Sequence, residues 1–167
     1  KARELNFDIV GFSSSEFLDK SIKKNLQRFV SEGRHGNMEW LENSIDRRSS
    51  PKKLWRSAKT AIIFASNYGP KNSPLDSLCK THIGNISVYA RNKDYHKWMK
   101  GRLKNFSSWF VSKTKASVKV FVDTAPIMEK PLAEQAGIGW IGKHTNLIND
   151  NYGNWLFLGV VLTDMKI

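Results

Sequence analysis

Two short apolar runs constrain the fold of this chain most strongly. Residues 61–65 read Ala-Ile-Ile-Phe-Ala, and residues 155–162 are apolar except for one glycine. A strand that is apolar on both faces has to be covered on both sides of its sheet. We therefore predict that both runs are central strands and that helices cover the two faces of their sheet.

Further strands and a long loop complete the predicted order. Shorter apolar or alternating runs predict strands at residues 7–10, 86–90 and 118–122. Residues 70–85 are rich in Pro, Ser, Asn and Gly and predict a long loop. The predicted fold class is α/β (α+β), with a single mixed sheet flanked by helices in one domain, residues 1–167.

Apolar residues at helical spacing predict helices over residues 17–30, 95–115 and 127–136. Ser13 and Glu16 precede the first helix with the spacing of a capping box, and Asp94 is the expected N-cap of the second. Gly137 is expected to end the third helix. A proline fits only the first turn of a helix, so Pro131 favours a later start for the third one.

Size and cysteine content bound the class of protein. No segment reaches the roughly 18 uninterrupted apolar residues of a membrane helix, so a soluble protein without a membrane partner is predicted. The single cysteine, Cys79, cannot form an intrachain disulfide and favours a reducing, cytoplasmic setting. Because the chain begins without Met and stops just after an apolar strand, we expect a piece of a longer protein. A monomer is expected.

The net charge of +12 is unevenly distributed. Residues 1–118 carry 23 Lys and Arg against 10 Asp and Glu, whereas residues 119–167 carry 4 against 5. A basic surface attracts polyanions, so nucleic acid or a phosphorylated substrate is a candidate partner. On charge alone, a basic bias of the whole proteome explains the excess equally well.

Asp123 is a candidate catalytic group because it follows the predicted strand 118–122, and strand ends are rigid and open onto crevices. Apolar Val122, Ala125 and Pro126 flank it, and an apolar surround helps a carboxylic acid to hold a proton near neutral pH. Asp is also a strong helix N-cap. A purely structural role at the start of the next helix is therefore the competing interpretation.

A glycine-rich turn, Gly-Ile-Gly-Trp-Ile-Gly-Lys, follows at residues 137–143. Its spacing matches neither the dinucleotide fingerprint nor the P-loop, and its glycines follow a helix instead of preceding one. Such glycines let the backbone approach a flat ligand closely, with Lys143 and Asn146 as polar contacts. A helix C-cap and a turn are the alternative, which accounts for Gly137 but less readily for three glycines around Trp140.

Other catalytic arrangements are not indicated by the sequence. The histidines at positions 35, 82, 96 and 144 lack the spacing of metal ligands, so no protein-bound metal is predicted. There is no serine nucleophile elbow, and Cys79 lies in the predicted loop without a catalytic context.

Several linked motifs of the chain resemble those of epoxyqueuosine reductases and occur in the same order. One is Asp-Thr-Ala-Pro at residues 123–126, followed by Glu129 and Lys130. The others lie at Gly33, His35-Gly36, Met38, Arg48 with Pro51, Asn67-Tyr68, Tyr89-Ala90-Arg91, Asp94-Tyr95-His96, residues 136–143, Asn146-Leu147 and residues 155–159. The resemblance therefore covers nearly the whole chain.

This resemblance implies an enzyme that uses cobalamin and iron-sulfur clusters to reduce epoxyqueuosine to queuosine in the anticodon loop of tRNA, the last step in making this nucleoside. It also implies a cobalamin domain similar to nitroreductases and to reductive dehalogenases. Asp123 would then be the proton donor to the opening epoxide. The expected cofactor contacts are Arg48, Tyr89, Tyr95, His96, Trp140, Gly142, Lys143 and Asn146.

Members of this family continue into a ferredoxin-like region with two four-iron four-sulfur clusters and then into helical repeats. Neither is present here, and one cysteine cannot supply the roughly four thiolates that each cluster needs. The chain is therefore expected to bind cobalamin without turning over on its own. Its basic segments, residues 47–59 and 97–115, are expected to face tRNA phosphates.

Two other classes of protein stay open at this point. A basic nucleic-acid-binding module without a cofactor predicts salt-sensitive RNA binding and no cobalamin binding. A flavin-dependent, nitroreductase-like oxidoreductase predicts uptake of flavin.

Overall fold

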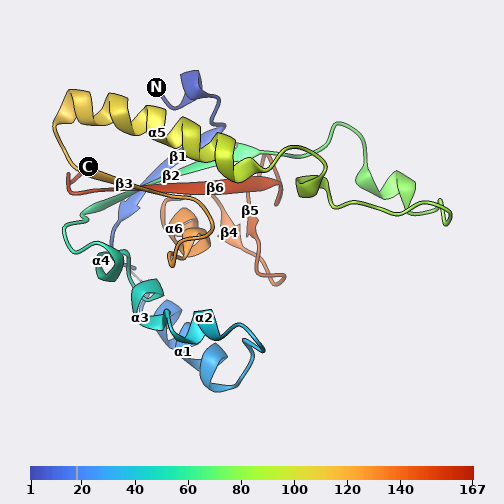
Figure 1. Ribbon diagram of the computed structural model, residues 1–167, viewed down its shortest axis with the longest axis horizontal. Coiled ribbons are helices and arrows are strands. Elements are labelled where there is room, and N and C mark those ends of the chain that lie inside the picture. The colour runs from blue at the N-terminus through green and yellow to red at the C-terminus, as the bar shows by residue number, and fades with distance from the viewer. Residues whose placement is uncertain (18) are drawn as a thin grey trace.

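The computed structural model describes residues 1–17 and 19–167, and over these residues the chain forms a main sheet between two helices (Figure 1). The strand order is β1 (Ile9–Ser14), β2 (Thr60–Asn67), β6 (Leu156–Thr163) and β3 (Val118–Phe121). Helix α5 (Tyr95–Thr114) covers one face of the sheet, and α6 (Glu129–Gln135) covers the other. The predicted α/β (α+β) class is confirmed.

The two apolar runs are the central strands, as predicted. β2 and β6 pair along their whole length, with Ile63 opposite Val160. Their alternate side chains enter two separate cores. Ile62 and Phe64 point toward α5, where Met99 and Leu103 are buried, and the opposite face packs against α6. The members of that second core include Ile63, Leu132, Ala133, Val160 and Leu162.

The prediction of a single sheet of mixed strand direction is wrong in detail. All three strand pairs of the main sheet are antiparallel, and a separate two-stranded ladder joins β4 (Trp140–Ile141) to β5 (Leu147–Ile148). The apolar pattern of a strand reports how deeply it is buried. It carries no information on the direction of the neighbouring strand.

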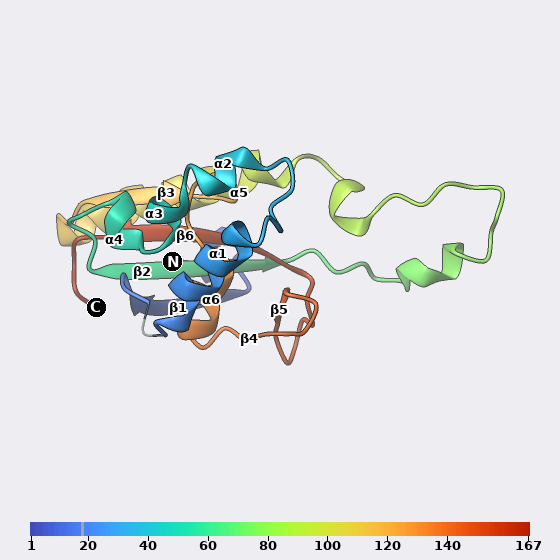
Figure 2. The same cartoon turned by 90° about the horizontal axis from the view of Figure 1, so that it is seen from below.

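Residues 69–91 form an arm that extends away from the sheet (Figures 1 and 2). Residues 86–90, predicted as a strand, instead end in the short 3-10 helix η3 (Val88–Ala90). A strand needs a partner for its backbone groups, and the arm extends past the ends of the strands, with Ile86 and Tyr89 exposed. The predicted loop over residues 70–85 is confirmed except for a second 3-10 helix, η2 (Pro74–Ser77).

The predicted capping box at Ser13 and Glu16 is wrong. Ser13 lies within β1, and the first long helix, α1, starts later and spans Ser21–Ser31. Asp19 accepts a hydrogen bond from the Ser21 N–H at 2.7 Å and takes the place of the expected cap. Leu18, which the apolar pattern assigned to this helix, lies outside the described residues.

The other helix ends follow the sequence signals. Asp94 caps α5 by accepting the His96 N–H at 3.0 Å. Because α6 begins at Glu129, Pro131 falls in its first turn, as its chemistry requires. Gly137 ends α6 with a φ of +71°, a left-handed conformation that favours glycine.

Short helices lie on the α6 side of the molecule, near α1 (Figures 1 and 2). They are α2 (Glu39–Glu42), α3 (Ile45–Arg48) and α4 (Pro51–Leu54), and the 3-10 helix η1 (Arg3–Leu5) lies at the N-terminus. The two basic segments predicted to face tRNA are therefore on opposite sides of the sheet. Across the described part of the chain, no helix combines the length and the apolar character needed to cross a membrane.

Candidate functional site

Asp123 lies in a tight turn that follows β3. The Thr124 N–H donates to the Val122 carbonyl at 2.6 Å, which closes a three-residue turn centred on Asp123, and the φ of Asp123 is +50°. This left-handed conformation is unfavourable for a residue with a side chain and persists only where the surroundings impose it. α6 begins six residues later, so the alternative of Asp123 as its N-cap is wrong.

The start of α5 supplies two partners for the Asp123 carboxylate. Both the Tyr95 hydroxyl, at 3.1 Å, and His96 Nε2, at 3.0 Å, lie within hydrogen-bond distance of Asp123 Oδ2. The other ring nitrogen of His96 faces Asp94 Oδ1 at 2.6 Å. Among residues 1–17 and 19–167, no hydrogen bond reaches Asp123 Oδ1. One oxygen of the carboxyl group is thus held and the other is available to a substrate.

The surroundings keep Tyr95 and His96 protonated as donors. Hydrogen bonding to Asp94 raises the pKa of His96 above its usual value; burial opposes this effect and the bond to Asp123 adds to it. Burial raises the pKa of Tyr95 well above its usual range, and the charge of Asp123 raises it further. Tyr95 therefore remains a phenol at any physiological pH, and the imidazolium form of His96 is favoured.

Glu129 contacts the backbone of the same residue from the other side of the sheet. The Asp123 N–H donates to Glu129 Oε1 at 3.0 Å. Burial raises the pKa of Glu129 to about 7, and the charge of Asp123 adds to that effect, whereas the hydrogen bond from the Asp123 N–H lowers it. Glu129 therefore exchanges between its charged and neutral forms near neutral pH.

A pocket of about 340 Å³ opens beside Asp123, between α6 and the short helices α2 and α3. Arg48 lines it with Trp40, and the guanidinium carbon of Arg48 lies 4.8 Å from the centre of the indole ring. Arg48 Nε also donates to Ser44 Oγ at 2.9 Å. Burial and the neighbouring charge of Arg47 lower the pKa of Arg48. The pocket thus presents an aromatic surface and a cation next to a carboxylic acid.

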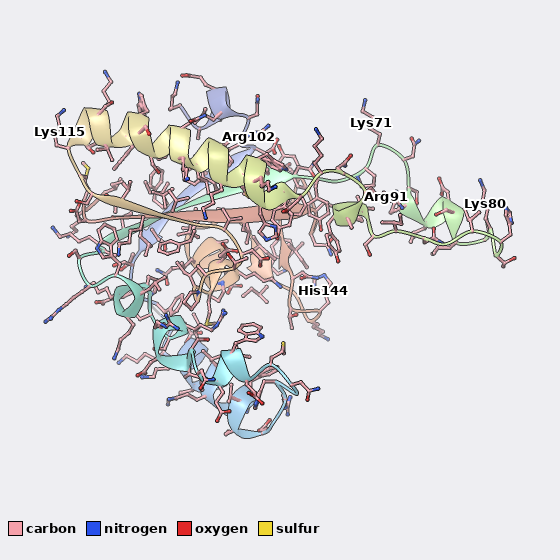
Figure 3. The ribbon with its side chains drawn as sticks, in the orientation of Figure 1. Lys71, Lys80, Arg91, Arg102, Lys115 and His144 are labelled. Atoms are coloured by element: carbon pink, nitrogen blue, oxygen red, sulfur yellow. The ribbon has the colours of Figure 1, made fainter. Side chains whose placement is uncertain are left out.

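The predicted glycine-rich turn is a hairpin, β4–β5, with an exposed tip (Figure 3). Lys143 and His144 lie at this tip, and Trp140 on β4 is 46% exposed. Lys130 Nζ connects the hairpin to α6, since it donates to the Thr145 carbonyl at 2.9 Å and to Asn146 Oδ1 at 3.0 Å. The predicted contacts Trp140, Gly142, Lys143 and Asn146 therefore form one group attached to the helix that carries Glu129.

Close packing within the hairpin favours glycine at two of its positions. A Cβ atom on Gly139 would lie 1.9 Å from the Ile148 carbonyl oxygen, so no larger residue fits without moving the backbone. A Cβ atom on Gly142 would meet the side chains of Ile148 and His144 instead. The close neighbour of Gly139 is the facing strand, so packing within the chain accounts for this glycine. The expectation that the glycines let a ligand approach closely stays a prediction.

Tyr89 is separate from the other predicted contacts. It lies on the arm and lines a different pocket, together with Tyr68 and Trp155. A stack of aromatic rings connects the two regions: Tyr68 lies 4.2 Å from Phe157 and Phe157 lies 3.9 Å from Tyr95, measured between ring centres. The structure therefore brings together all the predicted residues except Tyr89, in two neighbouring groups.

The surface around these groups fits a flat cofactor with polar edges. β6 is a central strand, yet the large apolar side chains of Trp155, Leu156, Phe157 and Leu158 remain partly exposed at its start. Partly exposed apolar side chains beside a polar hairpin are suited to contact a flat ring system. The exposed hairpin tip with Lys143 and Asn146 offers polar groups to a ligand's periphery.

The roles of Glu129, Lys130 and Trp40 are not apparent from the sequence. Glu129 and Lys130 were visible only as part of a motif, and their partners Asp123 and Asn146 are 6 and 16 residues away. Trp40 carried no signal beyond its apolar character. Among the described residues, no group of three or more His, Cys, Asp and Glu side chains is placed to hold a metal ion.

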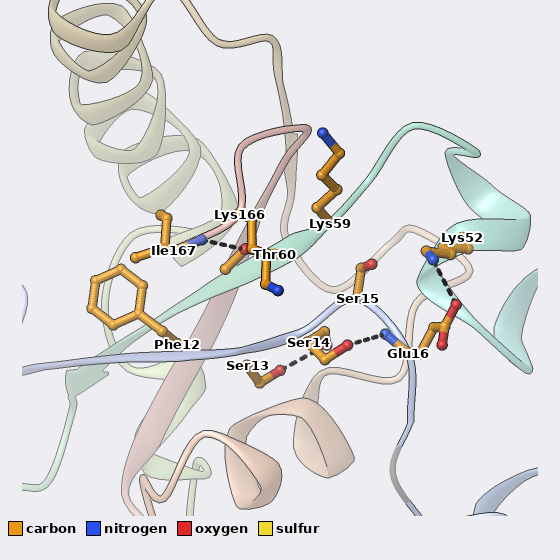
Figure 4. A pocket seen from close by; sticks show the side chains of 10 residues that line it. All are labelled: Phe12, Ser13, Ser14, Ser15, Glu16, Lys52, Lys59, Thr60, Lys166 and Ile167. Atoms are coloured by element: carbon orange, nitrogen blue, oxygen red, sulfur yellow. Dashed lines mark hydrogen bonds and ion pairs between the residues drawn. The ribbon is translucent and has the colours of Figure 1, made fainter.

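A third pocket, of about 340 Å³, lies at the end of β1 (Figure 4). Lys59 and Lys166 line it, and Lys52 at its edge is paired with Glu16 at 2.6 Å. None of the residues predicted to bind the cofactor or act in catalysis lines this pocket.

Comparisons with known proteins agree with the resemblance. A family model described as Epoxyqueuosine reductase QueG, DUF1730, matches residues 48–124. A curated epoxyqueuosine reductase of Leadbetterella byssophila is 36% identical over 167 residues, which are 99% of this chain and 53% of that protein. The one from Escherichia coli is 35% identical and matches 98% of this chain and 43% of its own length. The chain spans about half the length of the curated relatives it matches.

Solved structures show the same fold. An epoxyqueuosine reductase from Streptococcus thermophilus matches with a TM-score of 0.81 and 30% identity over 99% of this chain and 44% of that one. One crystallised with an epoxyqueuosine-modified tRNA-Tyr stem loop matches with a TM-score of 0.81 and 24% identity, over 98% and 43%. A B12-dependent reductive dehalogenase has a TM-score of 0.51 and 15% identity, over 98% and 18%. The predicted similarity to the reductive dehalogenase fold is confirmed, and that to nitroreductases stays a prediction.

Proposed function

We propose, because this chain belongs to the epoxyqueuosine reductase family, that it is the cobalamin-binding and substrate-binding domain of an oxidoreductase that converts epoxyqueuosine to queuosine in tRNA. Reduction of an epoxide to an alkene takes up two electrons and two protons and releases the oxygen as water. The domain therefore has to bind the electron-carrying cofactor, accept the modified nucleoside and supply a proton.

Asp123 is the proton donor in this proposal. The observation that supports this role is the difference between the two oxygens of the Asp123 carboxyl group. Tyr95 and His96 form hydrogen bonds with Oδ2, whereas Oδ1 has no hydrogen bond within the described chain. In this proposal Asp123 takes up a proton on Oδ1 before the step and passes it to the epoxide oxygen as the carbon–oxygen bond breaks, which avoids a free alkoxide. The pocket lined by Trp40 and Arg48 receives the flat base, since aromatic and guanidinium planes stack on nucleobases.

When bound, cobalamin would supply the electron-transfer chemistry needed to break the carbon–oxygen bond. The residues that would hold it are those of the hairpin, Trp140, Gly142, Lys143 and Asn146, together with the partly exposed apolar start of β6. Tyr95 and His96, which were predicted to contact the cofactor, act on Asp123 in this proposal. Arg48 lines the pocket beside Asp123, and Tyr89 on the arm is a more distant cofactor contact.

The rest of the enzyme supplies the electrons. Two four-iron four-sulfur clusters need about eight thiolates, and this chain has one cysteine, so they belong to a further region of the protein. We propose that residues 1–167 bind cobalamin as a single domain and do not turn over alone. A cytoplasmic, monomeric enzyme fits the tRNA substrate.

Titration of the purified chain with cobalamin tests the proposal. We expect the visible absorbance of cobalamin to change on binding, with saturation at micromolar concentrations. No spectral change at high micromolar ligand, or uptake of flavin in its place, would count against the cofactor assignment. Salt-sensitive RNA binding without any cobalamin binding would instead support the nucleic-acid-binding module.

RNA binding should depend on exposed basic residues on the pocket side of the sheet. Arg47, Lys53 and Arg56 are exposed in and just after helices α3 and α4, and α3 also carries the pocket-lining Arg48. Changing all three to Gln should lower the slope of log Kd against log salt by about 2, since each phosphate contact contributes about 0.7 to 0.9. The matched control removes Lys100, Lys104 and Lys113 from α5, on the other side of the sheet, and should change the slope by less than about 1. If the two triple variants changed the slope equally, RNA would not bind preferentially on the α3–α4 side of the sheet.

A further inference from the structure

We propose that Glu129 is a positioning residue for the proton donor, holding the backbone of Asp123 in the conformation that directs its carboxyl group into the pocket. This inference rests on the proposed function of Asp123. It assigns a role to helix α6. Glu129 on this helix forms a hydrogen bond with the backbone of Asp123, not with its side chain.

The conformation of Asp123 requires an external partner. Its φ of +50° and the tight Val122–Thr124 turn are strained for a residue with a side chain. The Asp123 N–H points out of that turn and donates to Glu129 Oε1 at 3.0 Å. Since a carboxylate is a stronger acceptor than a neutral oxygen, this bond favours the strained turn over an extended continuation of β3.

Two helices on opposite faces of the sheet thus hold one residue. α5 holds the side chain through Tyr95 and His96, and α6 holds the backbone through Glu129. Glu129 is the first residue of α6, where a negative charge is favourable because the first N–H groups of a helix are unpaired. The body of α6 is fixed by the buried side chains of Leu132 and Ala133, so the position of Glu129 is determined by the core.

The strength of this contact depends on the ionisation of Glu129. The titratable and charged groups near it are Asp123, His96 and Tyr95, with Arg48 and Lys130 lining the same pocket. Burial raises the pKa of Glu129 to about 7. As the pH falls through this value, Glu129 takes up a proton and becomes a weaker, neutral acceptor, so the turn at Asp123 is held less firmly and activity falls by a few fold.

The test compares variants of the intact, cluster-containing enzyme. Glu129→Gln offers the Asp123 N–H a neutral oxygen that cannot titrate, as protonated Glu129 does. Its kcat should therefore lie about threefold below the parent at pH 8 and should no longer fall as the pH drops through 7, so the acidic limb of the pH profile is lost. Glu129→Leu removes the acceptor, and kcat should fall by about 10- to 100-fold with unchanged cobalamin affinity. Amide hydrogen exchange of residues 122–124 should become faster in the Leu variant and stay slow in the Gln variant.

Glu134→Gln is the matched control, because it removes the same charge from α6 at a side chain that accepts the Ile141 N–H instead. This variant should keep the acidic limb. Two results would overturn the positioning role. One is an acidic limb that persists unchanged in Glu129→Gln, and the other is a Glu129→Leu variant with parental kcat and parental amide exchange. If Asp123→Asn were fully active the proposed function itself would fail, whereas an inactive Asp123→Asn with a fully active Glu129→Leu would reject the positioning role alone.

Discussion

Asp123→Asn is expected to lower the rate of epoxide reduction by about a hundred- to ten-thousandfold in the enzyme that includes its cluster-binding region. The amide has almost the shape of the carboxyl group, and its oxygen can accept from Tyr95 and His96 as Asp123 Oδ2 does. It carries no acidic proton for the epoxide oxygen. The loss should therefore appear in the chemical step and not in cobalamin affinity.

The measurement is formation of queuosine in a single turnover started with reduced enzyme, so that electron supply does not limit the rate. Tyr95→Phe is a suitable control, since it removes one donor to Asp123 Oδ2 and leaves the acid in place. That variant should lose about tenfold or less, the usual cost of one neutral hydrogen bond. A parental rate for Asp123→Asn would show that another group donates the proton.

Gly139→Ala is expected to lower the free energy of unfolding more than any other Gly→Ala substitution in the β4–β5 hairpin. The added Cβ would lie 1.9 Å from the Ile148 carbonyl oxygen, which is backbone and cannot rotate away. The pairing of Trp140 with Ile148 has to separate to make room. We expect a loss of about 2 to 4 kcal/mol, which lowers the thermal midpoint by about 5 to 15 °C in a domain of this size.

Gly142→Ala provides the comparison within the same hairpin. Its Cβ would meet Ile148 Cδ1 at 2.6 Å and His144 Cε1 at 2.8 Å, which are ends of side chains that can rotate. The thermal midpoint should then fall by less than about 4 °C. Because Lys143 and Asn146 are placed by the hairpin, cobalamin titration should show weaker binding for the Gly139 variant. Equal midpoints for the two variants would contradict the account of the backbone contact.

Much of the fold was predictable because it depends on local chemistry. The runs at 61–65 and 155–162 had to be buried on both faces, and they are the two central strands. Asp94 caps α5 and Gly137 ends α6, since each signal acts on backbone groups within a few residues. Residues 86–90 had the alternation of a strand but no neighbouring strand, so the same pattern became a turn on the arm.

The candidate site was only partly predictable. Asp123 and the hairpin residues could be selected by motif and spacing. The contacts of Asp123 with Tyr95 and His96 join residues 28 and 27 positions apart, and they depend on how α5 crosses the sheet. Periodicity reports which face of an element is apolar, and it does not report which elements meet.

Short-range chemistry was enough to locate the strands at the centre of the sheet and the main caps of the helices, because burial and capping act over a few residues. The order of the short motifs was enough to show the resemblance to epoxyqueuosine reductases. Three-dimensional packing was needed to hold the carboxyl group of Asp123 by α5 and its backbone by Glu129 on α6. Packing also placed the two basic segments on opposite sides of the sheet. The contacts of Asp123 and the positions of the basic segments both depend on two helices that cover opposite faces of one sheet. No local sequence pattern specifies this long-range arrangement.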